Sequence, residues 1–166
     1  MTVRNFYSVL IAILVLGIPA VASADWQSKV ITQCTQLVYD YAYYRDRWDA
    51  ENYSQLFMEN GYLVFPDGKT FKGRETLRKR VLEESGTEIS HHHMTSIKIL
   101  PVDEKSATGV SYLYILQAPS DAEVGALGVP APSMVASAEY HDDYILDGQR
   151  CRFASRKIKF VFDLSH

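Results

Sequence analysis

Residues 87–101 read TEISHHHMTSIKILP, and at this stretch the chain changes from a helical pattern to an extended one. From here to the C-terminus the sequence is rich in β-branched and aromatic residues, which favour strands. These residues fall in four long runs, near 88–101, 107–117, 133–146 and 150–163, with turn residues such as Asp147-Gly148 between them. The second half of the chain is therefore predicted to form a long antiparallel meander.

The part of the chain before this stretch has the periodicity of helices. Apolar residues recur at spacings of three and four between residues 26 and 48, which predicts an amphipathic helix with one buried stripe. A second helix is expected over 50–58, capped by Asp49, and a third over 74–85, stopped by Gly86. Residues 62–65 and 70–71 flank a Pro-Asp-Gly-Lys turn, which predicts a short hairpin.

Helices followed by a meander are typical of an α+β fold. The predicted strands are longer than most, so the sheet has to curl strongly, and a curled sheet with three helices across its open side encloses a pocket. One connection is unusually long. Residues 118–132, APSDAEVGALGVPAP, are marked by proline and small apolar residues, and they predict either a lid over an apolar ligand or a flexible surface excursion.

The first 24 residues, MTVRNFYSVLIAILVLGIPAVASA, have the pattern of a secretory signal peptide, with Arg4, then a short apolar run, then Ala22-Ser23-Ala24. We expect cleavage after Ala24, a secreted or periplasmic protein without stable membrane insertion, and a single domain over residues 25–166. An uncleaved membrane anchor is the alternative. The formal net charge is −3 and the chain has no long run of basic residues, which argues against a nucleic-acid partner.

The chain has two cysteines, Cys34 in the first predicted helix and Cys151 near the last predicted strand. An oxidising compartment would permit a disulfide between them. Spacing along the chain does not show whether their Cα atoms approach closely enough. A disulfide and two buried free thiols are both consistent with the sequence.

The three adjacent histidines are candidates for metal binding or proton transfer. Alternation along a strand places His91 and His93 on one face and His92 on the other, so the three cannot converge on one ion without a bulge. A metal site would need further ligands, which residues 141–143, His-Asp-Asp, would have to supply. We predict that the protein has no metal site. A histidine can instead exchange protons when a carboxylate orients its ring, and Asp46 is the candidate carboxylate. Asp46 also lies between two arginines, where a solvated surface position is the alternative.

Several segments, spread over nearly all of residues 25–166, resemble one known family. They are Tyr41-Ala42-Tyr43-Tyr44-Arg45-Asp46-Arg47-Trp48-Asp49, Leu56-Phe57, Lys72-Gly73-Arg74-Glu75, His92-His93-Met94-Thr95-Ser96-Ile97, Tyr144 and Asp147-Gly148. These segments are similar to the SnoaL-like branch of the NTF2-like superfamily, which contains polyketide cyclases, scytalone dehydratase, hexachlorocyclohexane dehydrochlorinase and bile-acid dehydratase. The resemblance implies an NTF2-like cone, with three N-terminal helices packed on a strongly curved antiparallel sheet.

In the dehydratase-like enzymes of this branch, an aspartate at the end of the first helix and a histidine just before the third strand form a catalytic dyad. The similar positions here are Asp46 and His92. Four residues after the histidine, where the family often has asparagine, this chain has Ser96. The match to His92 conflicts with simple alternation, which directs His91 and His93 toward the apolar face, and a bulge or a strand start would reverse the local facing.

The predicted function is that of a cofactor-free lyase or isomerase acting on a hydrophobic cyclic small molecule. His92, held by Asp46, would remove a proton from carbon. The tyrosines predicted to donate hydrogen bonds to the substrate are Tyr41, Tyr44, Tyr62 and Tyr112. The alternative is a secreted binding or assembly module that uses the same fold without turnover. By analogy with the family, we expect a homo-oligomer, either a dimer or a trimer.

Overall fold

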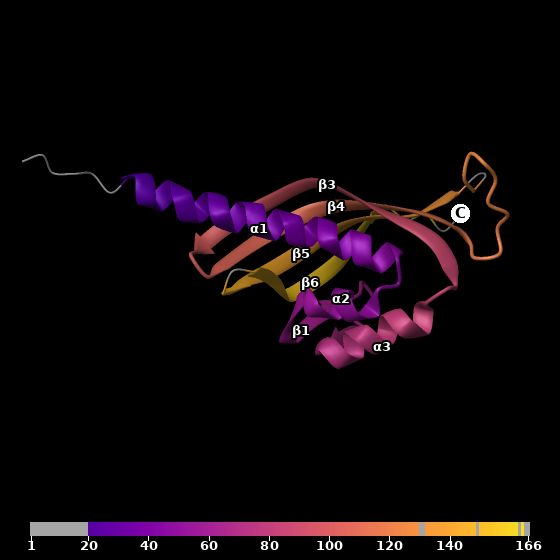
Figure 1. Cartoon of the computed structure of the whole chain (residues 1–166), viewed down its shortest axis with the longest axis horizontal. Coiled ribbons are helices and arrows are strands. Elements are labelled where there is room, and N and C mark those ends of the chain that lie inside the picture. Colours follow the sequence, from indigo (N-terminus) through magenta and orange to yellow (C-terminus); the bar gives the residue numbers. More distant parts are fainter. Residues whose placement is uncertain (1–19, 130–131, 149, 163, 165–166) are drawn as a thin grey trace, which may run out of the picture.

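A computed structural model describes residues 20–129, 132–148, 150–162 and 164 of the chain (Figure 1). Its order of elements, helices first and a long meander afterwards, confirms the predicted α+β class. The helices are α1 (Ala20–Asp46), α2 (Ala50–Gln55) and α3 (Arg74–Glu84). The strands are β1 (Phe57–Val64), β2 (Thr70–Lys72), β3 (Glu88–Asp103), β4 (Ser106–Pro119), β5 (Ser133–Asp147) and β6 (Arg150–Phe162).

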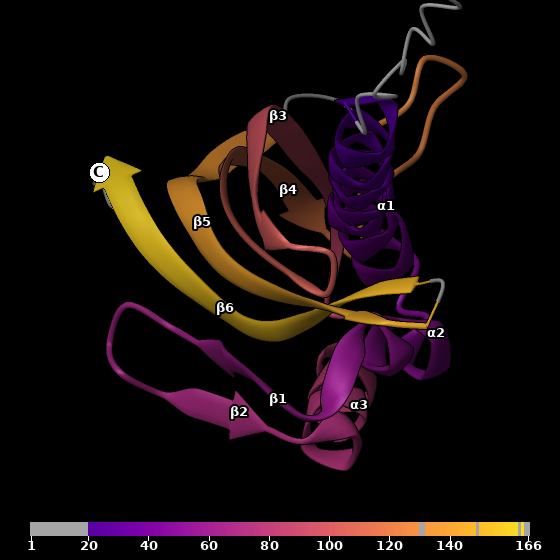
Figure 2. The same cartoon turned by 90° about the vertical axis from the view of Figure 1, so that its left-hand side faces the viewer.

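The six strands form one sheet in the order β2-β1-β6-β5-β4-β3. All neighbours are antiparallel except β1 and β6, which run parallel because the chain passes through β2, α3 and the whole meander before it returns beside β1. The long strands curl strongly and the sheet stays open, with α1 standing against its open side (Figure 2). The predicted cone of helices on a curved sheet is confirmed.

Helix α1 packs on the sheet through the apolar stripe that its sequence predicts. Val30, Cys34, Val38 and Tyr41 are all buried. A disulfide joins Cys34 to Cys151 on β6, with their Cα atoms 5.1 Å apart, and closes a separation of 117 residues. Of the two alternatives for the cysteines, the structure therefore has the disulfide.

The second helix is shorter than predicted. It begins after the Asp49 cap, whose carboxylate accepts the backbone N–H of Asn52 at 3.1 Å, but it ends at Gln55 instead of continuing to residue 58. Phe57 starts β1 because its fully buried ring packs on Phe153 of β6, with centroids 5.1 Å apart. Gly61 lies inside β1, where a Cβ would stand 2.7 Å from the Phe153 carbonyl oxygen. Tertiary packing thus decides a boundary that local pattern misplaced.

The predicted signal peptide lies largely outside the described residues, which begin at residue 20. The backbone of residues 20–24 is part of α1. Within the described part of the chain, no helix is long and apolar enough to cross a membrane.

Candidate functional site

A bulge in β3 determines where the histidines point. The pairing of β3 with β4 slips between Thr95 and Lys98, so that β3 carries one extra residue. Ser96, inside this segment, has a φ of 47°, in the left-handed region that asparagine tolerates better than most residues. An extra residue in one strand of a pair reverses the side-chain alternation beyond it.

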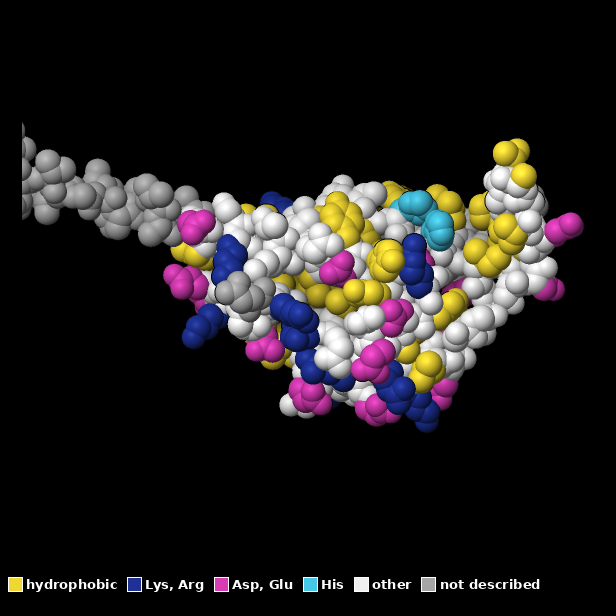
Figure 3. Space-filling model, viewed as in Figure 1, with side chains coloured by type: hydrophobic (Ala, Val, Ile, Leu, Met, Phe, Trp, Pro, Cys, Tyr) yellow, Lys and Arg dark blue, Asp and Glu magenta, His cyan; other side chains and the backbone are white. Residues whose placement is uncertain are grey.

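On the N-terminal side of this bulge, Ser90 and His92 face the interior, while His91 and His93 are exposed. Past the bulge the inward positions are odd-numbered, as at the buried Ile99. Alternation without a bulge therefore gave the wrong facing for His91 and His93. Figure 3 shows histidine side chains gathered on the surface over β3.

Asp46 and His92 are in direct contact, one from the last turn of α1 and the other from β3. The Asp46 Oδ1 atom lies 2.5 Å from His92 Nδ1, and Asp46 Oδ2 accepts the His92 backbone N–H at 2.9 Å. The side chains are only 12% and 6% exposed, so Asp46 is not the solvated surface residue of the alternative reading. Because Asp46 occupies Nδ1, Nε2 is the ring nitrogen left to exchange a proton.

The two arginines that flank Asp46 in sequence bind elsewhere. Arg45 forms a salt bridge of 2.8 Å with Glu84 and stacks over Trp48. Arg47 stacks over the ring of Tyr43. The Asp46 carboxylate is therefore left to His92.

His92 lines a cavity of about 170 Å³ between the helices and the concave face of the sheet. Its polar walls are Arg45, Arg80, Glu88, His92 and Gln117, and its aromatic and aliphatic walls are Tyr41, Phe65, Leu113, Ile115, Ala136, Tyr140, Ile158 and Phe160. An apolar protein cavity of about 150 Å³ is enough to hold benzene. The size of this cavity thus fits a ligand built on a single ring.

The structure places one of the four predicted substrate-binding tyrosines, Tyr41, in the cavity wall. Tyr44 lines a separate cleft between α1, α2 and β6. Tyr62 lies next to the buried Leu63 on β1 and Tyr112 next to the buried Leu113 on β4; since neighbours in a strand face opposite ways, both tyrosines point away from the core. Tyr44, Tyr62 and Tyr112 are accordingly not part of the cavity.

Sequence reasoning missed Tyr140 and Arg80. Tyr140 lies two residues before Asp142 and four before Tyr144, and all three side chains are buried on the same face of β5. Arg80 is buried on the stripe of α3 that also carries Leu77 and Val81, at the spacing of one helical turn. The strand period of two, counted back from Tyr144, would have identified Tyr140. The helical spacing of three and four residues along α3 would have identified Arg80.

Tyr41 belongs to a buried cluster of tyrosines. The Tyr53 hydroxyl donates to the Tyr41 hydroxyl at 3.3 Å, and the rings of Tyr41 and Tyr140 meet edge to face with centroids 5.5 Å apart. Burial, and next the proximity of Tyr41, raise the pKa values of Tyr53 and Tyr140 well above the usual value. These phenols therefore stay protonated and act as hydrogen-bond donors.

Behind this wall lies a buried ion pair. Arg156 Nε and Nη2 donate to the two carboxylate oxygens of Asp142 at 2.8 and 2.7 Å, and the guanidinium stacks 4.1 Å from the rings of Tyr41, Tyr140 and Phe153. Burial alone would lower the pKa of Arg156, but the charge and hydrogen bonds of Asp142, together with the nearby Tyr41 and Tyr144, raise that pKa above its usual value. Arg156 is thus a permanent cation that supports the wall.

Residues 141–143, the ligands considered for a metal site, lie away from the exposed histidines. The register pairs His141 with Val110, and Val110 with Lys98, five residues beyond His93. His141 contacts Glu139 at 2.8 Å, whereas Asp142 binds Arg156. These ligands are therefore not assembled with His91 and His93.

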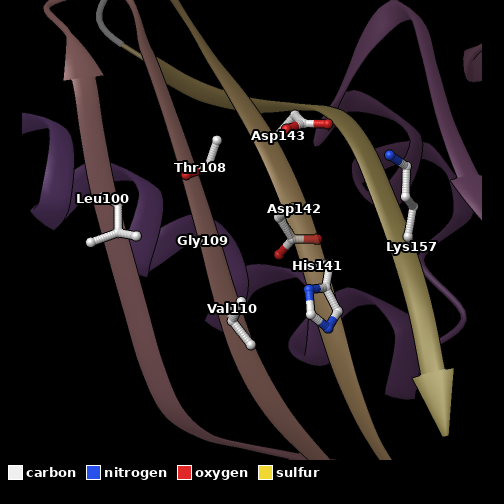
Figure 4. A pocket seen from close by; sticks show the side chains of 8 residues that line it. All are labelled: Leu100, Thr108, Gly109, Val110, His141, Asp142, Asp143 and Lys157. Carbon is white, nitrogen blue, oxygen red and sulfur yellow. The ribbon is translucent and has the colours of Figure 1, made fainter.

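A separate hollow of about 260 Å³ lies on the outer face of the sheet, over β4, β5 and β6 (Figure 4). Thr108, Val110, His141 and Lys157 line it. Helix α1 lies on the other side of the sheet in this view. The outer hollow is therefore distinct from the cavity that His92 lines.

The long connection between β4 and β5 extends past the end of the sheet (Figure 1). Its described residues, 120–129, form turns held by a bridge between Gly125 and Gly128, and the side chain of Leu127 is fully exposed. None of these described residues lines the His92 cavity. The lid stays a prediction.

Comparison with known proteins supports the fold. Rv3472, a Mycobacterium tuberculosis protein of unknown function, is 24% identical with a TM-score of 0.71, over 90% of this chain and 80% of that one. A putative scytalone dehydratase from Novosphingobium aromaticivorans is 19% identical with a TM-score of 0.72, over 84% and 89%. LinA is 13% identical with a TM-score of 0.68, over 84% and 91%. At these identities the likeness shows the fold alone.

No curated protein matches the chain. The model of the SnoaL-like domain, by contrast, matches residues 26–157, which span most of α1, all of α2 and α3, and most of the sheet. The match includes Asp46, His92 and the residues that line the cavity, except Ile158 and Phe160. This protein belongs to the SnoaL-like family.

Proposed function

We propose that the protein is a cofactor-free lyase or isomerase in which His92 removes a proton from a carbon atom of a small cyclic substrate. The observation that carries the proposal is the contact between Asp46 and His92 at the wall of a largely apolar cavity. A buried histidine oriented by a carboxylate is suited to general base catalysis. Exclusion of water by the apolar walls strengthens the electrostatic interactions inside.

In this mechanism Nε2 of His92 accepts the proton and the imidazolium that forms is stabilised by Asp46. The electron pair of the broken C–H bond either expels a leaving group from the neighbouring carbon or moves into a conjugated carbonyl. Return of the proton to a departing hydroxide completes a dehydration, and its return to another carbon completes an isomerisation. Neither route needs an electron acceptor. Tyr41, whose oxygen already accepts from Tyr53, can donate its own proton toward the oxygen where charge develops.

The proposal is tested by deuterium exchange, which reports proton abstraction without knowledge of the leaving group. Cyclohexanone and 2-cyclohexenone are incubated with the protein in D₂O, and incorporation of deuterium at carbon is followed by NMR. His92→Ala and Asp46→Asn are expected to lower the exchange rate by about 10²–10⁴-fold. His91→Ala, which alters the exposed neighbour, is the matched control and retains the rate.

Circular dichroism and cooperative thermal unfolding establish that each variant is folded. An exchange rate in His92→Ala equal to that of the unaltered protein would contradict the mechanism. Ring binding in the unaltered protein with no exchange over the solvent background would instead favour the binding module.

We further propose that residues 1–24 are removed on export, leaving a secreted or periplasmic protein that begins at Asp25. The Cys34–Cys151 disulfide supports this, because disulfides persist in oxidising compartments. The intact mass of the exported protein tests the cleavage site. A mass that includes residues 1–24 would show that the segment is retained as an anchor.

A further inference from the structure

Two buried arginines line the same cavity as His92. Arg45 comes from the last turn of α1 and Arg80 from α3, and their exposed fractions are only 5% and 9%. Arg45 lies over the ring of Trp48 and Arg80 over the rings of Phe65 and Phe71, so aromatic faces hold both guanidinium planes. The two cations are built into the wall of the cavity.

Their acidic partners occupy only one side of each guanidinium. Glu84 Oε2 accepts from Nη2 of Arg45 at 2.8 Å and lies 3.0 Å from Nη2 of Arg80, so one carboxylate oxygen serves both cations. Glu88, which also lines the cavity, lies 3.7 Å from the same Nη2 atom of Arg45. The Asp46 carboxylate, next to Arg45 in the sequence, is bound to His92.

Three buried nitrogen atoms of this pair lack a hydrogen-bond partner among the described residues: Nη1 of Arg45, and Nε and Nη1 of Arg80. Leaving a buried donor unsatisfied costs free energy, and the cost is larger for a charged group. Adjacent N–H groups of a guanidinium form a fork that matches the two oxygens of a carboxylate. Both side chains line the cavity, so the cavity wall contains two arginines that have donors without a partner among the described residues.

We propose that Arg80, assisted by Arg45, binds an anionic oxygen group of the substrate, a carboxylate or the oxygen of an enolate. This inference rests on the proposed function and names its substrate class: a single-ring carbon acid that carries such an oxygen. The oxygen pairs with the guanidinium groups, the ring packs on Leu113, Ile115 and Ile158, and the C–H bond faces His92. A cation at the oxygen stabilises the charge that proton removal creates.

The experiment compares three ligands that share one ring and differ in its substituent: toluene, benzamide and benzoate. Their dissociation constants are measured by titration calorimetry on the unaltered protein, on Arg80→Gln and on Arg78→Gln. Arg78 lies on the same helix but pairs with Glu75 on the surface, which makes it a matched control. Benzoate is expected to bind the unaltered protein most tightly, and Arg80→Gln to weaken benzoate by about tenfold to a hundredfold, the range of a charge-assisted hydrogen bond.

Toluene binding should be unchanged in Arg80→Gln, which also shows that the cavity of the variant remains intact. Arg78→Gln should bind all three ligands like the unaltered protein. Equal affinities for benzoate and toluene in the unaltered protein would overturn the inference, as would benzoate binding that Arg80→Gln does not weaken.

His92→Ala separates this inference from the catalytic proposal. If the arginines form an anion site, the alanine variant still binds benzoate in preference to toluene although exchange at carbon is lost. Benzoate preference with unimpaired exchange in His92→Ala would refute the base and retain the anion site. Exchange that depends on His92 without any preference for benzoate would retain the base and refute the anion site.

Discussion

Two acid–base pairs lie inside the same fold, on either side of the Tyr41 ring, and they have opposite properties. Asp46 and His92 are nearly buried, with side chains 12% and 6% exposed, whereas Asp142 and Arg156 are both 0% exposed. Tyr41 stands between the pairs, with its ring centroid 6.5 Å from the His92 ring and 4.1 Å from the Arg156 guanidinium. In both pairs, a basic side chain is buried in contact with a carboxylate.

The difference lies in the proton and in the space beside it. A guanidinium does not lose its proton in a protein, and the Asp142 carboxylate accepts two hydrogen bonds from Arg156 and one from the Tyr144 hydroxyl, at 2.7 Å. An imidazole exchanges its proton, and His92 lines a cavity that can admit a ligand. The comparison teaches that a buried charge pair indicates a reactive site only where one member can titrate and faces open volume.

The largest effect on stability is expected from breaking the pair that cannot titrate. Asp142→Ala leaves the Arg156 cation uncompensated in the core and should lower the free energy of unfolding by about 3–5 kcal/mol. Asp46→Ala removes hydrogen bonds from a partner that can become neutral, so its cost should be smaller, about 1–3 kcal/mol. Urea denaturation measures both. Equal losses in the two variants would contradict the distinction.

Much of the fold was predictable, because local periodicity and the final packing agree. The four long strands and the first and third helices lie within a few residues of their predicted ranges, except that α1 begins at Ala20. The exception inside the domain is residues 56–61, where Phe57 packs against Phe153, almost a hundred residues later. The parallel pairing of β1 with β6 is another long-range feature, and nothing in the local pattern of either strand indicates it.

The candidate site was predictable only where a motif marked it. The resemblance selected His92 as the partner of Asp46, and the bulge at Ser96 explains why alternation alone pointed to the neighbouring histidines. Tyr44 and Tyr112 were chosen by residue type, which does not determine facing. Arg80 was overlooked because an arginine on a helix is usually solvated, although its neighbours on the stripe are apolar.

The disulfide links the elements that carry the two pairs, since Cys34 and Asp46 are on α1, and Cys151 and Arg156 are on β6. Removing a long-range disulfide releases entropy in the unfolded chain, and we expect Cys34→Ala/Cys151→Ala to lose about 2–5 kcal/mol of unfolding free energy. Denaturation with and without reductant measures this. The apolar stripe of α1 still packs on the sheet without the disulfide, so the folded double variant should retain benzoate binding. If reductant also lowers the free energy of unfolding of the double variant, the effect of reductant does not come from this disulfide.

The smallest effect, counted for each residue, is expected from the buried tyrosines at high pH. Burial, the largest cause, raises the pKa values of Tyr53, Tyr140 and Tyr144 above the usual value, and for Tyr144 the Asp142 carboxylate raises it further. An unfolded tyrosine ionises near pH 10. Below that pH both states are protonated and stability is unaffected. Above it only the unfolded state loses protons, so the free energy of unfolding falls as pH rises.

By pH 11 this linkage amounts to about 1.4 kcal/mol for each tyrosine that stays protonated in the folded state. Urea denaturation at pH 9, 10 and 11 measures the slope. Tyr144→Phe should reduce this slope by the contribution of one tyrosine, because it removes the phenol beside the Asp142–Arg156 pair. Tyr140→Phe, at the cavity wall, should reduce it by the same amount. His92→Ala should leave the alkaline slope unchanged. A slope that is insensitive to Tyr144→Phe would mean that this hydroxyl ionises as readily in the folded core as in water, which its bond to Asp142 should prevent.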